Sequence, residues 1–348
     1  MGKKRARTYS TPFQVEQIAG GLVNGEVKSK PKRVPIVPKW LPKLHCLCGA
    51  FGVVRSGKSN ALVNLIDEYW KHKSLNMLFC ISPTYDSNTS LQTLPFEENG
   101  IFTDSTTSVQ ALDRICSLIE QRVMEHNEEE EYRTAYKAWR KGRETPNEYA
   151  RLSRQHFRKP QLIPWPQPGI FIDDMTHTEL MANTINNKLS HLSLHHRHLH
   201  NVGVSIFQAF QTFRSGMPKV VRGNLGLILL FPTCNMQEIE DIYKEVSNNI
   251  TFETFKRLLF EATKGTHDFL LIDKLCEDPC KQFGRNFDQK FIIDPVEERR
   301  KLLSLNSGPE EPSPQGEEQE ENPNEEFPGK IDQARKHDAS SRKRRRSA

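Results

Sequence analysis

The chain has 348 residues, 36% of them hydrophobic, and a formal net charge of +5 at pH 7. This length suits one large α/β core or two smaller domains. The longest apolar runs, such as residues 225–231, are too short to cross a bilayer, which needs about 20 residues. The basic start is not followed by the apolar stretch of a signal peptide. We therefore expect an intracellular protein with no membrane partner.

Charge is distributed in blocks at the two ends. Residues 1–43 contain ten Lys/Arg against Glu16 and Glu26, and residues 308–329 contain eight Glu and no basic residue. Residues 342–346 are Arg-Lys-Arg-Arg-Arg, which indicates a nuclear-localisation or nucleic-acid-binding patch, or else a solubilising tail. Such blocks are typical of disordered segments. We expect a basic arm over 1–43, a folded domain over 44–305 and a disordered, acidic then basic tail over 306–348.

The middle of the chain alternates between apolar runs and amphipathic segments. In chain order, the pattern first predicts a strand at 44–54, a helix at 60–72, a strand at 76–81, a helix at 109–124 and a mostly helical insertion at 128–168. It then predicts a strand at 169–172, a helix at 178–199, strands at 202–207 and 225–231, helices at 239–246 and 252–263, and a last strand at 268–272. Buried strands alternating with helices predict a mostly parallel sheet with helices on both faces. Ligands bind such sheets at the carboxyl ends of the strands.

The first strand runs into a complete G-x-x-x-x-G-K-[ST] motif, the P-loop or Walker A motif. Its glycines let backbone N–H groups wrap phosphates, and the following helix contributes its positive dipole end. Lys58 is expected to reach the β- and γ-phosphates, and the Ser59 hydroxyl to ligate Mg²⁺. The predicted ATP-binding residues are Gly52, Val53, Val54, Arg55, Ser56, Gly57, Lys58, Ser59 and Asn60.

The strand at 169–172 ends in two carboxylates, as a Walker B element does. Asp173 would hold Mg²⁺, in most such sites through water, and Asp174 would orient or activate the attacking water. Alternatively, the pair only opens a turn or caps a helix. The P-loop upstream favours the catalytic interpretation.

The order of the strands indicates a class of P-loop protein. The strand at 76–81 and a long connection separate the two motif strands, and the strand at 202–207 follows the second motif. This order suits the additional-strand class, which includes RecA-like motors, and suits nucleoside kinases less well. Motors of this class place a polar sensor after the fourth strand, where Gln208 and Gln211 are candidates and ordinary surface glutamines are the alternative.

Five features together resemble the poxvirus-type genome-packaging ATPases of the FtsK–HerA superfamily, found in large DNA viruses, virophages and Polinton-like elements. They are the P-loop, Ile81-Ser82-Pro83-Thr84, Asp173-Asp174, Arg197-His198, and the run from Gln208 through residues 217–224, which contains a Pro and Arg-x-Asn. The resemblance covers roughly residues 44–275, and its late motif is the most specific part. The chain departs from the family pattern at Arg55, where Gly is common. Gln211 fits the family spacing to Arg-x-Asn better than Gln208, whereas Gln208 fits the predicted strand end better.

The resemblance implies a homo-oligomeric ring that hydrolyses ATP to drive double-stranded DNA into a preformed capsid, with a capsid or portal partner. It implies that Gln208 or Gln211 senses the γ-phosphate and that Arg222 acts as an arginine finger toward a neighbouring subunit. For Arg222, a salt bridge or a DNA-facing position is the alternative. Other interpretations of the whole chain are a HerA-like cellular or transposon-borne DNA translocase or helicase, and a nucleotide-switched scaffold with weak hydrolysis. The expected location is the host nucleus or a virion-assembly site.

Two further groups of residues bear on partners. The N-terminal arm and residues 132–158 combine positive charge with aromatic side chains, as DNA-backbone contacts require, although both could be solvated surface. Cys46 and Cys48 are expected to be buried as small hydrophobes. Cys276 and Cys280, with His267 upstream, lack the further ligands that a zinc site needs. A second group of possible metal ligands has no supporting carboxylate or cysteine, and a polar helix end explains it: His191, His195, His196, His198 and His200.

Overall fold

The computed structural model describes residues 35–233, 235–246 and 250–306. The predicted arm up to residue 34 and the predicted tail from residue 307, with its basic cluster at 342–346, lie outside the described residues. The chain divides into two units, Met1–Ser304 and Leu305–Ala348, and the fold described below is that of the first unit.

Within the described residues, nine strands form one sheet in the order β3-β2-β4-β5-β1-β6-β7-β8-β9. The strands are β1 (Leu47–Phe51), β2 (Met77–Ile81), β3 (Ile101–Phe102), β4 (Pro168–Ile172), β5 (Ser205–Phe210), β6 (Leu227–Leu230), β7 (Leu270–Asp273), β8 (Phe283–Arg285) and β9 (Gln289–Lys290). The pairs from β3 to β6 are parallel, and β7, β8 and β9 join the sheet antiparallel. The predicted mostly parallel α/β sheet is therefore confirmed.

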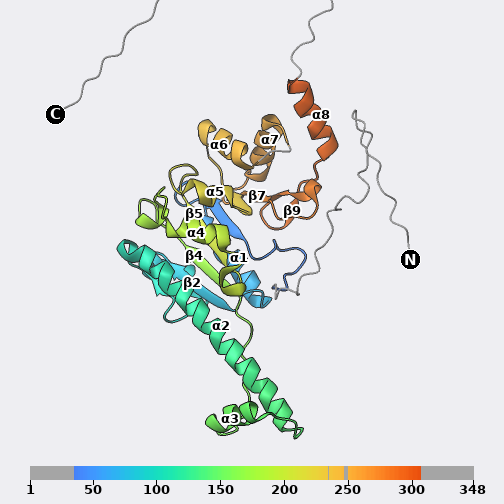
Figure 1. Cartoon of the computed structure of the whole chain (residues 1–348). Helices are drawn as coiled ribbons and strands as arrows, with labels where there is room; N and C mark the ends of the chain where they lie inside the picture. The colour runs from blue at the N-terminus through green and yellow to red at the C-terminus, as the bar shows by residue number, and fades with distance from the viewer. Residues whose placement is uncertain (1–34, 234, 247–249, 307–348) are drawn as a thin grey trace, which may run out of the picture. The chain divides into compact units, whose positions relative to one another are not determined.

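Helices cover both faces of this sheet (Figure 1). The helices of the described residues are α1 (Lys58–Lys71), α2 (Ser108–Trp139), α3 (Pro146–Arg154), α4 (Lys188–His195), α5 (Lys219–Gly223), α6 (Met236–Val246), α7 (Phe252–Ala262) and α8 (Pro295–Asn306). Of these, α3 does not cover the sheet, and the last residues of α8 belong to the second unit. No helix in the described ranges is long and apolar enough to span a membrane.

Side chains of each central strand alternate between two cores. Cys48 and Ala50 of β1 pack in the core that contains α1, with Leu62 and Ile66. Phe51, on the other face, packs in the core that contains α2 and α4. Strands that are buried on both faces carry apolar residues at every position, which is why these strands are visible in the sequence as continuous apolar runs.

Several predicted boundaries were wrong. β5 runs three residues later than predicted, because residues 202–204 still belong to the turn after α4. The single helix predicted at 178–199 is interrupted: a short 3-10 helix at Glu179–Met181 is followed by α4, which starts anew because the side chain of Asn187 accepts a hydrogen bond from Ser190 N. The three strands β3, β8 and β9 were missed because two or three residues are too few to show a period.

The packed region also begins before residue 44. Leu41 is 6% exposed, the Tyr69 hydroxyl donates to Pro42 O at 2.8 Å, and the Ser74 hydroxyl donates to Ile36 O at 2.7 Å. These contacts hold residues 36–42 against the end of α1.

The helix predicted at 109–124 continues without a break to residue 139. Its first half packs Leu112, Ile115 and Ile119 on the sheet. Its second half pairs with α3 around a separate small core of Tyr132, Ala135 and Leu152. A capping box at Thr145 and Glu148 starts α3. In Figure 1 this helical hairpin extends past the sheet, with α3 at its far end, and it occupies most of the segment predicted as an insertion.

Candidate nucleotide site

The loop between β1 and α1 has the backbone geometry of a phosphate-binding turn. Gly57 has φ 100° at the start of α1, in the left-handed region that favours glycine. A Cβ at Gly52 would lie 2.6 Å from the Cβ of Phe231, so only glycine fits there. Arg55 also has a positive φ, of 66°, which for a residue with a Cβ costs about 1–2 kcal/mol. This backbone explains why glycine suits the position at which the chain departs from the family pattern.

Lys58 lies over the loop that it follows. Its ammonium donates to Gly52 O at 2.8 Å and to Val53 O at 2.7 Å. Burial lowers the pKa of Lys58, which the two nearby carboxylates partly oppose. The cation is therefore held where the loop closes, within reach of any anion that the loop binds.

Ser59 and Asp173 meet although they are 114 positions apart. The Ser59 hydroxyl at the start of α1 donates to Asp173 Oδ2 at 2.7 Å, just past the end of β4. Burial raises the pKa of Asp173 to about 6, an effect that the Ser59 hydrogen bond opposes. The two predicted Mg²⁺ ligands thus form one cluster.

These donors fit a magnesium ion. A serine hydroxyl and a carboxylate are the hard oxygen ligands that Mg²⁺ prefers, and the ion binds through one or two carboxylates together with phosphates. A buried carboxylate with a raised pKa also favours a cation, whose charge would offset the burial.

Asp174 lies beside this cluster and faces solvent. It has φ 53°, and its Oδ2 accepts a hydrogen bond from the Thr84 hydroxyl at 3.4 Å. The Thr84 hydroxyl in turn forms a hydrogen bond with the Ser82 hydroxyl, at 3.1 Å between the two oxygens, beyond the end of β2. The motif Ile81-Ser82-Pro83-Thr84 therefore lies next to the carboxylate pair. An exposed carboxylate here can orient a water molecule or accept its proton.

The strand order shows the fold class. β5 lies between β1, which carries the P-loop, and β4, which carries Asp173. The chain has the additional-strand P-loop NTPase fold. The carboxyl ends of β1 and β4 lie at the same edge of the parallel sheet, which is where such sheets bind their ligands.

Neither a protein-family model nor a curated protein matches the sequence of this P-loop NTPase. The solved structures that are similar to it include the following three. The genome packaging NTPase B204 from Sulfolobus turreted icosahedral virus 2, in complex with ATP-gammaS, is 14% identical with a TM-score of 0.41, over 71% of this chain and 98% of that chain. The pCW3 conjugation coupling protein TcpA is 14% identical with a TM-score of 0.37, over 80% of this chain and 75% of that chain. EccC from Thermomonospora curvata is 14% identical with a TM-score of 0.39, over 72% of this chain and 37% of that chain.

The two candidate sensor glutamines occupy different positions from those expected. Gln208 lies inside β5, level with Ile172 of β4, and is fully buried. Neither its Oε1 nor its Nε2 has a hydrogen-bond partner among the described residues. Gln211 is the first residue after β5 and is exposed. The expectation that Gln208 fits the strand end better was wrong, because β5 ends at Phe210; which glutamine senses the γ-phosphate stays a prediction.

Arg222 is engaged within its own chain. It is 8% exposed, and one of its terminal nitrogens donates to Arg214 O at 2.7 Å and to Met217 O at 3.1 Å. Its Nε lies 3.3 Å from the Glu245 carboxylate. This arrangement is the salt-bridge alternative for Arg222, and the role as an arginine finger stays a prediction.

His267 contacts the P-loop, although the sequence did not single it out for this role. Its Nδ1 lies 3.2 Å from Ser56 O, and its ring would contact a Cβ at Gly57. The turn that carries it is held by Asp268, which accepts a hydrogen bond from Arg285 Nε at 3.0 Å. No sequence motif marks His267, because only the antiparallel return of β7 brings it to the loop.

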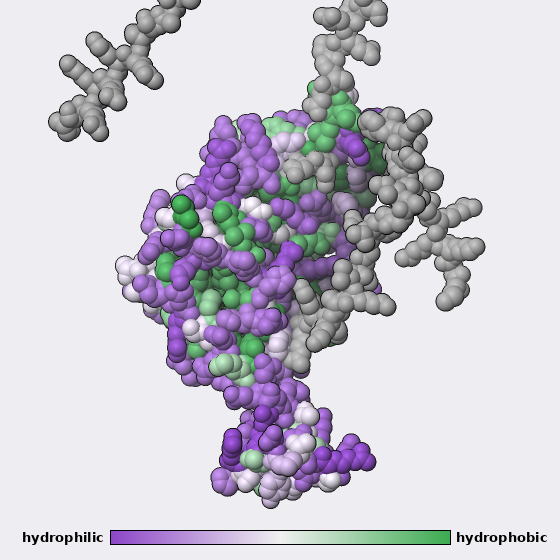
Figure 2. All heavy atoms as spheres, in the orientation of Figure 1, coloured by the Kyte–Doolittle hydropathy of each residue, from purple (hydrophilic) through white to green (hydrophobic). Residues whose placement is uncertain are grey.

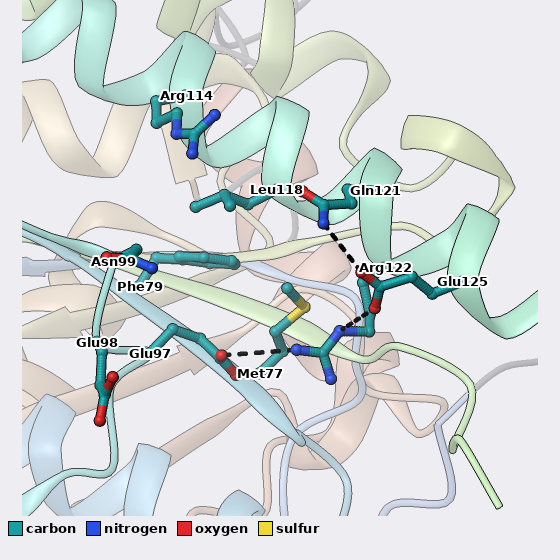
Figure 3. A pocket seen from close by; sticks show the side chains of 10 residues that line it. All are labelled: Met77, Phe79, Glu97, Glu98, Asn99, Arg114, Leu118, Gln121, Arg122 and Glu125. Atoms are coloured by element: carbon teal, nitrogen blue, oxygen red, sulfur yellow. Dashed lines mark hydrogen bonds and ion pairs between the residues drawn. The ribbon is translucent and has the colours of Figure 1, made fainter. Parts of the chain in front are cut away.

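A cavity of about 480 Å³ lies apart from the nucleotide site, between α2 and the β2–β3 edge of the sheet (Figure 3). Arg122 crosses it, 3.8 Å from Glu97 and 3.3 Å from Glu125. The cavity shares no residue with the P-loop or with Asp173 and Asp174. Arg122, Glu97 and Glu125 are thus paired with one another within the chain.

The described part of the chain holds no group of three or more His, Cys, Asp or Glu side chains that could bind a metal ion. Cys46 and Cys48 are completely buried, as predicted, and burial raises the pKa of both thiols. They are small hydrophobes of the core that contains α1.

Proposed function

We propose that the chain is an ATPase that translocates double-stranded DNA, and that this DNA is a viral genome entering a preformed capsid. The observation that carries the ATPase proposal is the hydrogen bond between Ser59 and Asp173, which joins the P-loop to the Walker B strand. The late run from Gln208 through Arg222 to Asn224 supports the motor through its resemblance to packaging ATPases.

Each residue has a distinct role in this proposal. Lys58 exchanges the carbonyls of Gly52 and Val53 for phosphate oxygens and positions the terminal phosphates. Ser59 and Asp173 would hold Mg²⁺, which neutralises charge as the phosphoryl group transfers. Asp174 orients the attacking water and accepts its proton.

The test is ATP hydrolysis by the full chain, with and without linear double-stranded DNA. We expect stimulation by DNA, and loss of turnover in Lys58→Ala and Asp174→Asn. Asp174→Asn should still bind ATP, because Asp174 is exposed and lies outside the loop. Turnover that DNA does not change would contradict the motor and favour a nucleotide-switched scaffold.

The hairpin of α2 and α3 is the proposed DNA contact within the described residues. Its surface is largely hydrophilic on the face shown in Figure 2. Six exposed cations have no carboxylate partner among the described residues: Lys137, Arg140, Lys141, Arg143, Arg154 and Lys159. Unpaired cations can bind backbone phosphates without first breaking an ion pair.

A triple variant tests this contact. With Arg140, Lys141 and Arg143 each changed to Gln, the slope of log K for DNA against log salt should fall by up to about 3, since each phosphate contact contributes about 0.9. A control with the same charge change uses Lys71, Lys244 and Lys281, which pair with neighbouring carboxylates. Equal effects of the two triple variants would contradict a specific role for the hairpin.

We also propose a homo-oligomeric ring with a capsid or portal partner, in the host nucleus or at a virion-assembly site. The basic cluster at 342–346 supports the nuclear part. A reporter fused to residues 330–348 should accumulate in the nucleus, and a reporter that stays cytoplasmic would contradict it.

A further inference from the structure

An open groove of about 890 Å³ adjoins the P-loop on the side away from Asp173. Its walls come from the loop after β1, the loop after β6, and helices α6 and α7. They are formed by Val53, Pro232, Thr233, Met236, Ile239, Lys256, Leu259, Phe260, Thr263 and Lys264. The groove is continuous with the phosphate loop, because Val53 lines the groove while its carbonyl accepts a hydrogen bond from Lys58.

Large apolar side chains lie exposed around this groove. Phe260 is 72% exposed, Val53 58% and Met236 54%. Clustered apolar surface of this kind marks a binding site more often than free surface. Its position beside the P-loop indicates which ligand would cover it.

The strand order gives the direction in which a nucleotide would lie. Asp173 marks the end of the site where the terminal phosphates belong, and it follows β4, two strands from β1. β6 pairs with β1 on the opposite side, and the residues just after β6, Pro232 and Thr233, line the groove. A nucleotide with its terminal phosphates toward Asp173 therefore has its base toward β6.

We propose that this groove binds the nucleobase of the nucleotide, with the base stacked on Phe260 and packed against Met236. The proposal rests on the proposed ATPase function. A nucleobase is flat and has two weakly polar faces, which match an aromatic ring and a thioether. Thr263 already donates to Leu259 O at 2.7 Å, so its hydroxyl is engaged within the chain. Stacking and apolar contact hold the base.

The experiment compares two probes that share phosphates but differ in the base. The full chain is titrated calorimetrically with Mg²⁺ and ATP, and separately with Mg²⁺ and inorganic tripolyphosphate. Phe260→Ala should weaken ATP binding about 10-fold to 100-fold, the loss expected for one stacked base, and leave tripolyphosphate binding unchanged. Ile292→Ala, at a residue that is 71% exposed and outside the groove, is the matched control and should change neither.

A second variant keeps the test independent of any folding defect in Phe260→Ala. Phe260→Trp retains an aromatic face, and its added fluorescence should be quenched by ATP and not by tripolyphosphate. Equal losses for both probes in Phe260→Ala, or no loss for either, would overturn the base site. Failure of the proposed function looks different: the wild-type chain would bind neither probe, or Lys58→Ala would bind tripolyphosphate as well as the wild type does.

Discussion

Arg222 illustrates how a residue with an expected catalytic role can have a structural one. Its buried guanidinium joins the loop after β5, through Arg214 O and Met217 O, to Glu245 of α6. Removal of the guanidinium leaves those two carbonyls without this donor. The position therefore affects stability whether or not it also affects catalysis.

Arg222→Ala should lower the free energy of unfolding by about 2–3 kcal/mol, the penalty for unpaired buried groups. Urea denaturation measures this loss. Arg257→Ala, at an exposed arginine of α7, should change stability by no more than about 0.5 kcal/mol. Loss of ATP hydrolysis with unchanged stability would contradict this structural role and support the arginine finger.

His45 makes stability depend on pH. It packs against Gly203, where a Cβ would lie 2.5 Å from the imidazole ring. Burial, with a smaller contribution from neighbouring His196, lowers the pKa of His45 to about 4. Between its unfolded pKa of 6.5 and its folded pKa of about 4, the unfolded chain binds more protons, so this contribution to stability is present above pH 6.5 and is lost as the pH falls.

From pH 6.5 to pH 5, His45 should account for a loss of about 2 kcal/mol. The urea midpoint of His45→Gln should therefore fall less over this range than that of the wild type. His156→Gln, which changes an exposed histidine, is the control, and its urea midpoint should fall over this range as the wild type's does. Parallel pH profiles for wild type and His45→Gln would show that His45 is not the titrating group.

At the scale of elements, α2 belongs to two packing units. Its first half lies in a core of the sheet, whereas its second half and α3 share the separate core of Tyr132, Ala135 and Leu152. Separate cores can open separately, because few apolar contacts link them.

Leu152→Ala should therefore destabilise the hairpin locally, by about 2–5 kcal/mol. In native-state hydrogen exchange, amides of α3 and the second half of α2 should exchange faster, while those of β1 and β4 should not. Ile115→Ala, in the first half of α2, should instead speed exchange in the sheet. Faster exchange at β1 in Leu152→Ala would show that the hairpin unfolds with the rest.

At the scale of the whole molecule, the nucleotide site is assembled from distant parts of the chain. Ser59 and Asp173 come from different elements and meet only when β1, β5 and β4 pair. A ligand that needs both residues binds the folded chain and not the unfolded one. Its binding free energy therefore adds to the stability of the folded chain.

Mg²⁺ and ATP at about 100 times the Kd should add about 2.7 kcal/mol to the free energy of unfolding. The measurement is the shift of the thermal unfolding midpoint. Lys58→Ala should show no such shift. A full shift in this variant would mean that the ligand binds elsewhere.

Much of the fold and part of the site could be predicted from local patterns. The central strands are buried on both faces and so carry unbroken apolar runs, and the P-loop is a contiguous motif whose chemistry depends on neighbouring residues. Because Asp173 and Asp174 directly follow a strand, the sequence also placed them at the sheet edge. The additional-strand class followed from the order of these elements.

Tertiary packing decided the rest. Whether Gln208 or Gln211 follows β5 depended on pairing with β1 and β4, which extends the strand to Phe210. The contacts of Arg222 with Glu245, of His267 with the P-loop and of Phe260 with the groove join residues that no local period relates. The phosphate-binding residues could thus be predicted from the sequence, because their chemistry depends on neighbouring positions. The residues around them could not, because long-range packing brings them there.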